Sequence, residues 1–204
     1  PIYLQPGDKV ALISPSGVAT KEQLDAACSL LTSWELEPVP GQHVLSRHGR
    51  LAGTDEERLH DLQTALDAED IRAIWCMVGD YGMLRIVQEA DYSIFQGNPK
   101  WVIGMNDITV LHAKLHSLGI ESLHAFMPSD YNTTSPEVVT QLRNFLFGII
   151  SSYAIPAHPF NRPGIVETEM IGGMLQWVHN LHDTCIERNT RGTVSYTHLT
   201  LPTI

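Results

Sequence analysis

Short, continuously apolar runs alternate with amphipathic stretches along the first 130 residues, and this alternation limits the fold more than any other feature. Four runs have the length and composition of buried strands: residues 9–14, 71–78, 100–104 and 120–126. Four stretches carry apolar residues at helical spacing: from Lys21 onward, from Thr54 to about Leu66, after Gly82 with Leu84 and Val87 on one face, and from Asp107 to Leu118. Apolar strands separated by helices predict a parallel sheet covered on both faces, an α/β doubly wound domain over residues 1–130.

The composition excludes several classes of protein. The chain of 204 residues has a formal net charge of −10 and no Lys/Arg cluster, so a nucleic-acid surface is not expected. No run of 18 apolar residues occurs, which argues against a membrane span, and the absence of a secretory signal favours a cytoplasmic protein. Cys28, Cys76 and Cys185 show no metal-binding spacing, so we expect reduced thiols and no metal or cofactor.

The alternation of apolar runs and amphipathic stretches ends near residue 130. Residues 131–163 combine a helical stretch with three closely spaced prolines, Pro156, Pro159 and Pro163, and are interpreted as a helix and linker. Residues 164–192 are interpreted as the incomplete start of a second domain. The last segment, residues 193–204, reads TVSYTHLTLPTI and resembles translated sequencing-adapter read-through. We expect a non-native tail there, and a short terminal strand is the alternative.

Three loops follow the carboxyl ends of predicted strands, where doubly wound folds bind their ligands: 14–17, 79–82 and 104–107. Asn106 occupies a strand-to-helix turn, a position that projects a side chain beside free N–H groups able to hold an oxyanion. A neutral carboxamide is not a useful nucleophile, however. Spacing alone therefore favours a helix-capping role for Asn106 or Asp107.

Other candidate residues flank the same loops. Gly79 and Gly82 allow a tight turn close to a ligand, although the turn matches no phosphate-loop pattern, and an ordinary turn in which Tyr81 packs on its neighbours is the alternative. His124, at the end of the fourth strand, is expected to face the cleft. His112 and His116 are four residues apart without the HEXXH pattern, so they are interpreted as helix-packing residues and not metal ligands.

Several motifs in order resemble the LD-carboxypeptidase family, which includes muramoyl-tetrapeptide carboxypeptidases and microcin C self-immunity peptidases. The motifs are Pro6-Gly7-Asp8, Ser14-Pro15-Ser16, residues 51–58 (LAGTDEER), residues 78–82 (VGDYG), Pro99-Lys100 and residues 104–109 (GMNDIT). The resemblance covers about residues 6–184. It implies a Rossmann-like N-terminal domain, a β-rich C-terminal domain and an active site between them.

The resemblance also implies an activity and a site. Members of the family use Ser, Glu and His to release a C-terminal D-amino acid from murein peptides, so a murein-derived peptide is the expected partner and a homodimer stays open. The family's serine falls on Asn106. Gly79, Asp80 and Asp107 fall on its oxyanion-hole region.

The departures from the family pattern lie around one cleft. Asn106 replaces the serine, and Val78-Gly79-Asp80 replaces Arg-Gly-Gly. If the Asp80 carboxylate faces the oxyanion hole, it repels a substrate carboxylate and a developing oxyanion. Phe126 is expected to fill space meant for substrate. The Glu and His roles fall on no residue of this sequence. We therefore expect a diverged, fragmentary relative that lacks the usual peptidase activity.

Two alternatives stay open. One is an active hydrolase that uses a different nucleophile, either Ser16 at the end of the first strand or Ser129. The other is a non-catalytic Rossmann-like domain that binds a small molecule or a peptide, because fold alone does not determine function.

Overall fold

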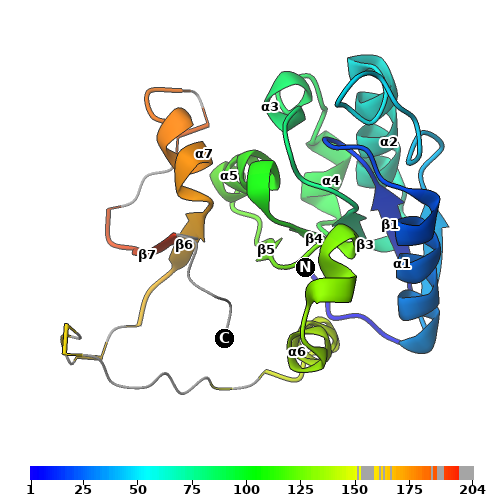
Figure 1. Cartoon of the computed structure of the whole chain (residues 1–204). Coiled ribbons are helices and arrows are strands. Elements are labelled where there is room, and N and C mark those ends of the chain that lie inside the picture. The colour runs from blue at the N-terminus through cyan, green and yellow to red at the C-terminus, as the bar shows by residue number, and fades with distance from the viewer. Residues whose placement is uncertain are drawn as a thin grey trace.

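The computed structural model contains a five-stranded sheet with every neighbouring pair of strands parallel, in the order β2-β1-β3-β4-β5 (Figure 1). Helices cover both of its faces, so the α/β doubly wound prediction is confirmed. The structure describes residues 1–150, 152, 159–160, 162, 164–165, 167–184, 186–187 and 191–197. The order places a switch point between β1 and β3, where such sheets bind ligands.

The strands of this sheet match the predicted apolar runs, with one addition. Their bounds are β1 (Lys9–Ile13), β2 (Glu37–Pro40), β3 (Ile71–Cys76), β4 (Trp101–Gly104) and β5 (Leu123–His124). β5 is shorter than the predicted run at 120–126. Its pairing with β4 covers only Ile103↔Leu123 and Gly104↔His124, after which the Ala125 N–H bonds the Gly104 carbonyl at 3.2 Å.

β2 is the strand that the sequence did not predict. Pro38 and Pro40 read as helix breakers, yet they lie in a strand paired with β1 through Val10↔Pro38 and Leu12↔Pro40. Proline has no N–H to donate to a ladder, but β2 is an edge strand with only one neighbour, where a missing donor is tolerated. The prolines are therefore compatible with this position and also protect the edge from further pairing.

The predicted helix starts are confirmed by their caps. Thr20 and Thr54 each form a capping box, with Gln23 and Glu57 respectively, at the start of α1 and α2. Short helices also occur where no helix had been predicted, as with α4. The helical elements of the sheet unit are α1 (Lys21–Ser33), α2 (Asp55–Asp67), α3 (Met83–Ile86), α4 (Ser93–Gly97), η1 (Asn106–Ile108), α5 (Thr109–Ser117), η2 (Pro128–Thr133) and α6 (Pro136–Leu146).

Two apolar cores lie on opposite faces of the sheet. One is formed by α2, α3, α4 and α5 with residues such as Leu62 and Ile74. The other is formed by α1 and α6 with residues such as Trp75 and Leu146. The Leu4 N–H bonds the Leu146 carbonyl at 2.7 Å, so the N-terminus and the end of α6 lie together. α6, within the segment 131–163, thus packs on the same core as the sheet.

The C-terminal part contains a separate pair of strands. β6 (Met170–Gly173) and β7 (Val194–Thr197) are parallel, and α7 (Leu175–Asn180) follows β6 and packs against α5 (Figure 1). β7 falls within the segment predicted to be a non-native tail; the origin of that segment and the domain boundaries stay predictions. In the described ranges, no helix has the length and apolarity that crossing a bilayer requires.

The structure describes two of the three cysteines, Cys28 and Cys76. Cys76 is buried in β3 and Cys28 is half-buried on α1, and neither forms a disulfide. Burial raises the pKa of the Cys76 thiol far above its usual range, which makes it unreactive. Cys185 lies outside the described residues.

Candidate functional site

The three loops at the carboxyl ends of β1, β3 and β4 meet, as the sequence predicted. A β-carbon added to Gly17 would lie 2.8 Å from Val78 Cγ1, and one added to Gly79 would lie 2.7 Å from the Met105 carbonyl and 2.9 Å from Asn106 Cβ. Contacts below 3.0 Å are not found for real β-carbons. Glycine is therefore required at both places for the loops to pack this closely.

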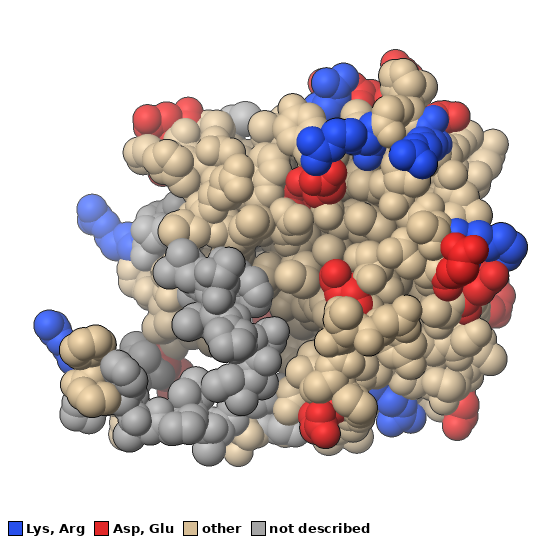
Figure 2. Space-filling model, in the orientation of Figure 1, with Lys and Arg blue, Asp and Glu red and all other residues tan. Residues whose placement is uncertain are grey.

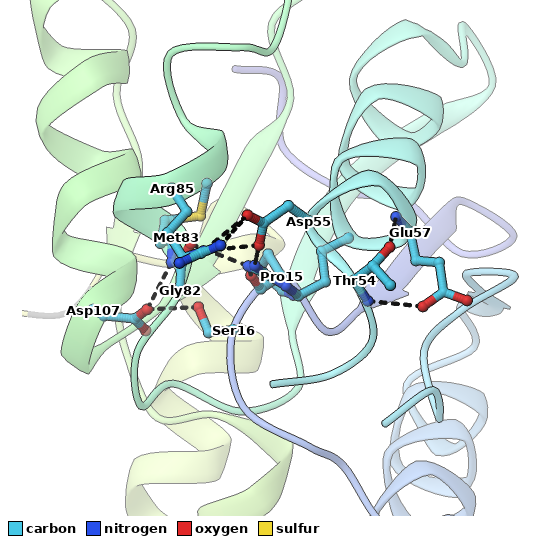
Figure 3. Close-up of polar contacts among 10 residues, drawn as sticks. Pro15, Ser16, Thr54, Asp55, Glu57, Gly82, Met83, Arg85 and Asp107 are labelled. Carbon is cyan, nitrogen blue, oxygen red and sulfur yellow. Dashed lines mark hydrogen bonds and ion pairs between the residues drawn. The ribbon is translucent and has the colours of Figure 1, made fainter. Parts of the chain in front are cut away.

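Asp107 is the residue that joins these loops (Figure 3). Its side chain is fully buried, and Oδ2 accepts hydrogen bonds from Ser16 Oγ at 2.7 Å and from the Met83 N–H at 3.1 Å. Oδ1 accepts a third from the Asp80 N–H at 3.1 Å. One carboxylate thus holds loop 14–17, loop 79–82 and the start of α3 in a fixed arrangement.

Two effects oppose each other in the electrostatics of Asp107. Burial raises the pKa of the Asp107 carboxyl, while the hydrogen bonds from Ser16, Met83 and Asp80 act to lower it. All three donors favour the ionised form. The carboxylate therefore supports the loops from within, and its burial keeps it away from a substrate.

A second polar network supports the site from α2 (Figure 3). The buried Arg58 guanidinium donates to the Pro15 carbonyl at 2.7 Å and the Gly82 carbonyl at 3.0 Å, and it also contacts Asp55. Asp55 in turn accepts from Arg85 Nε at 2.9 Å. Because of Arg85 and Arg58, the pKa of the Asp55 carboxyl is lowered. This network connects the ends of β1 and β3 to the first turn of α2.

Asn106 adopts the backbone conformation of a nucleophile elbow. Its φ is +60°, in the left-handed region, and it directly follows the β4 end and Met105. Asparagine tolerates this region better than most residues, so the geometry is kept without a large steric cost. Its carboxamide nitrogen lies 3.4 Å from the Gly79 carbonyl, and its oxygen accepts from Trp177 Nε1 at 3.3 Å. Asn106 is thus not a side-chain helix cap.

The N–H groups around the elbow divide into bonded and available ones. The Asp80 N–H is committed to Asp107, whereas in the part of the chain that the structure describes the N–H groups of Gly79 and Asp107 donate to no acceptor. Gly79 and Asp107 therefore retain donors at the predicted oxyanion region. Asp80 does not.

Asp80 has a counter-charge in the structure, which the sequence did not reveal. Its carboxylate accepts from Arg50 Nη2 at 3.0 and 3.2 Å, and it is directed to the loop at 48–51. An opposite charge at this distance offsets the repulsion. Arg50 is largely exposed, so this pair can separate when a charged ligand competes for either partner.

An open groove of about 630 Å³ lies next to the Gly79–Gly82 turn. It is lined by His48, Gly49, Arg50, Leu51, Thr54, Asp55, Glu56, Tyr81 and Arg85. Both cations and carboxylates contribute to its wall. On the face seen in Figure 2, basic and acidic side chains likewise lie together near the upper right, without a field of one sign.

The other candidate residues predicted from the sequence do not form one site with Asn106. Ser16 is fully buried and its hydroxyl is bonded to Asp107, so it cannot reach a substrate as a nucleophile. Ser129 is half-buried, and its N–H bonds the Met77 carbonyl at 3.1 Å. Tyr81 is exposed, with its ring 6.2 Å from that of Trp177. His124 lies beside His112, with ring centroids 6.1 Å apart, and not with the Asp107 cluster.

Phe126 does not fill substrate space, contrary to expectation. It is buried in the core, its ring meets that of Trp75 edge-on at 5.5 Å, and its carbonyl accepts from Trp75 Nε1 at 3.0 Å. Phe126 is thus part of the core behind the sheet and not of the elbow.

Three residues of the site escaped sequence reasoning. Arg58 occupies an inward position of α2, one turn before Leu62, and a charged residue on a helix face expected to be apolar is the signal that could have revealed it. Arg50 and Trp177 carry no such local signal. They reach Asp80 and Asn106 from loops and helices distant in sequence.

Comparisons with known proteins agree on one family. The sequence profile described as the LD-carboxypeptidase N-terminal domain matches residues 10–125. The chain is 30% identical over 198 residues to a Bacillus subtilis protein named probable murein peptide carboxypeptidase, which covers 94% of this chain. It is 38% identical over 122 residues to the murein tetrapeptide carboxypeptidase of Pseudomonas aeruginosa, which covers 59% of this chain. The chain spans 62% and 40% of the lengths of these two relatives.

Solved structures show the same fold. The microcin C7 self-immunity protein in complex with aspartyl sulfamoyl adenosine superposes with a TM-score of 0.81 at 18% identity, over 96% of this chain and 69% of that one. The muramoyltetrapeptide carboxypeptidase of Oxalobacter formigenes superposes with a TM-score of 0.77 at 22% identity, over 89% of this chain and 62% of that one.

Proposed function

Because the chain belongs to the LD-carboxypeptidase family, we propose that it is a relative that binds a murein-derived peptide in the cytoplasm without hydrolysing it. The observation that carries this proposal is Asn106, which has the φ of +60° expected of an elbow residue but presents a carboxamide. A carboxamide has no proton that can be removed at accessible pH, so it does not form the covalent intermediate of a serine hydrolase.

The contacts of Asn106 support a non-catalytic role. The described hydrogen-bond partners of its side chain are the Gly79 carbonyl and Trp177 Nε1, and neither is a general base. Removal of a nucleophile leaves only the rate enhancement due to binding and oxyanion stabilisation, which is lower by many powers of ten.

Peptide binding is supported by the groove beside the elbow. Arg50 and Arg85 line it, and both guanidinium groups are accessible, with side chains 82% and 49% exposed. Guanidinium groups bind carboxylates in a bidentate manner. Murein peptides carry free carboxylates, and two relatives are named for acting on such peptides. A short acidic peptide is therefore the ligand that the groove fits.

Turnover is the test of the non-catalytic half of the proposal. The protein incubated with an L,D-tetrapeptide should release no D-alanine above a blank, and Asn106→Ala should behave in the same way. Asn132→Ala, at an exposed asparagine away from the groove, serves as the control. Clear turnover that Asn106→Ala abolishes would overturn the proposal.

Binding is tested separately by calorimetry with the same tetrapeptide. Arg50→Ala should weaken binding by about tenfold, corresponding to loss of one charge-assisted contact. Arg47→Ala, in the same loop but outside the groove, should leave it unchanged. Equal affinities for the two variants, or stabilisation by nucleotides or sugars and not by the peptide, would instead favour a generic small-molecule domain.

The alternative of another nucleophile has its own readout. A serine-reactive phosphonate should label neither Ser16, which is buried against Asp107, nor Ser129. Stoichiometric labelling of either residue would support an active hydrolase.

A further inference from the structure

A cluster of histidine and carboxylate groups lies away from the elbow, between the loop that follows β2 and the middle of α2. It consists of His43 on the loop and His60 and Asp61 on the helix. Each of the three offers one ligand atom, and these atoms lie within 4.8 Å of one another. Because the ligands come from two elements, His43 precedes His60 by 17 positions, and no short motif marks the cluster.

Asp61 is the buried member of this cluster. Its side chain is only 4% exposed, and Oδ2 accepts a hydrogen bond from the His43 N–H at 2.8 Å. The loop packs closely against this oxygen, since a β-carbon added to Gly41 would lie only 2.4 Å from Asp61 Oδ2. A buried carboxylate requires a counter-charge or a metal ion. In the described part of the chain, the one basic side chain within 4.0 Å of its oxygens is the imidazole of His60, at 3.4 Å, which carries a charge only when protonated.

The two imidazoles are arranged around Asp61 and do not stack on each other. Their ring centroids are 5.4 Å apart and the rings are nearly perpendicular, at 85°. A second carboxylate is in reach, because Glu57 Oε1 lies 3.6 Å from His43 Nδ1. Glu57 is itself fixed by the capping box, in which its Oε2 accepts from the Thr54 N–H at 2.8 Å. One oxygen of Glu57 is thus positioned next to His43.

The cluster is accessible from solvent. The His60 side chain is 53% exposed, and a cavity of about 220 Å³ opens beside it, with Gly41, Gln42, His60 and Asp61 in its wall. The cavity gives an ion a path to the buried carboxylate. It also leaves room for water to complete a coordination sphere.

We propose that His43, His60 and Asp61 bind a zinc ion, with Glu57 Oε1 or water as the fourth ligand. Two imidazoles and one or two carboxylates are a donor set that suits Zn²⁺ and related late first-row ions, whereas Mg²⁺ and Ca²⁺ prefer oxygen ligands alone. The ligand atoms need to approach by small side-chain rotations, since Zn²⁺ binds nitrogen and oxygen at about 2.0–2.2 Å.

The bound ion would reinforce a connection that the hydrogen bond from the His43 N–H to Asp61 already makes. It would attach the loop after β2, an edge strand, to α2. The same loop is linked to the end of β1, because Ser14 Oγ donates to the Val44 carbonyl at 2.7 Å. A zinc ion at this position would therefore stabilise the region of loop 14–17 without touching the elbow.

Calorimetry with ZnCl₂ on the whole, tag-free chain, stripped beforehand with EDTA and dialysed, tests the proposal. We expect one equivalent to bind, and His60→Ala and His43→Ala each to weaken binding at least about tenfold. His60 is half-exposed, so its replacement should leave the fold intact, which near-ultraviolet circular dichroism checks. MgCl₂ in place of ZnCl₂ should give no binding heat.

A matched control distinguishes this cluster from a second one. His182, Asp183 and Glu187 also bring ligand atoms together, but all three are exposed. His182→Ala should retain zinc binding. The proposal is overturned if zinc does not bind, if both His43→Ala and His60→Ala bind as the unmodified chain does, or if only His182→Ala abolishes binding.

Discussion

The five-stranded unit and the β6–α7–β7 segment bury their apolar residues to different extents. In the first, Ile74 and Trp75 on the central strand are fully buried, and two cores cover the sheet. In the second, Met170, Leu175 and Val194 are 67%, 43% and 38% exposed. A pair of strands with one short helix cannot enclose a core by itself. The segment is therefore ordered by what it packs against.

The contacts that order the C-terminal segment lie at the elbow. Trp177 is buried against the α2–α5 core and donates to Asn106, and the Met174 N–H donates to Thr109 Oγ1 at 3.1 Å. A β-carbon on Gly173 would lie 2.4 Å from Thr109 Cγ2, so the two units approach very closely there. Residue 106 is therefore a docking point between the two units.

The largest expected effect is on the free energy of unfolding, when a leucine is replaced by alanine at a buried position of the sheet unit and at an exposed position of the C-terminal segment. Leu62→Ala, at a fully buried position of α2, should lower the free energy of unfolding by about 2–5 kcal/mol. Leu175→Ala, at a 43% exposed position of α7, should change it by less than about 0.5 kcal/mol. Urea unfolding measures both. Similar losses for the two variants would mean that the C-terminal segment is part of the same cooperative core.

A smaller effect concerns pH and involves the sheet unit alone. The Lys100 ammonium is buried at the start of β4 and donates to the Ala65 and Leu66 carbonyls at 2.9 Å each, at the end of α2. Burial lowers the pKa of Lys100 to about 8, although the charges of Asp67 and Asp70 act to raise it. The lysine thus contributes least to stability while it is charged.

The sign of the pH effect follows from proton binding. Between pH 8 and 10.5 the unfolded chain holds the Lys100 proton and the folded protein has released it, so the free energy of unfolding should rise with pH there. The rise is at most about 3 kcal/mol. Lys100→Met should remove it, while Lys114→Met, at a half-buried lysine on α5, should keep it. A flat profile for the unmodified chain would contradict this prediction.

The smallest change in the free energy of unfolding is expected at the contact between Trp177 and Asn106. Trp177→Phe removes the donor to Asn106 and keeps an aromatic ring, so the free energy of unfolding should fall by about 1 kcal/mol or less. Amide hydrogen exchange in Leu175–Asn180 should nevertheless become faster, because local opening separates this helix from α5.

Trp34→Phe is the matched control in the sheet unit, since Trp34 is buried on the opposite face against Trp75. It should lower global stability without a selective increase of exchange in α7. If Trp177→Phe leaves exchange in α7 unchanged, the contact with Asn106 does not order the segment.

Several elements followed from the sequence because their causes are local. The apolar run of β1 is continuous because both faces of a central strand are buried, and Thr20 and Thr54 start helices because their side chains accept from N–H groups three residues away. β2 was missed because whether a proline is tolerated depends on how many neighbours a strand has. That number is a property of the sheet and not of the segment.

The sequence by itself determined the α/β alternation, the helix starts and the three loops that meet at the strand ends, because periodicity and capping act over a few residues. Only the tertiary structure decided which groups face one another. Ser16 and Asp107, 91 positions apart, share a hydrogen bond, Arg50 compensates Asp80, and Asn106 bonds Trp177. Such pairings depend on strand order and on loops in close contact, and these arise from packing over the whole chain.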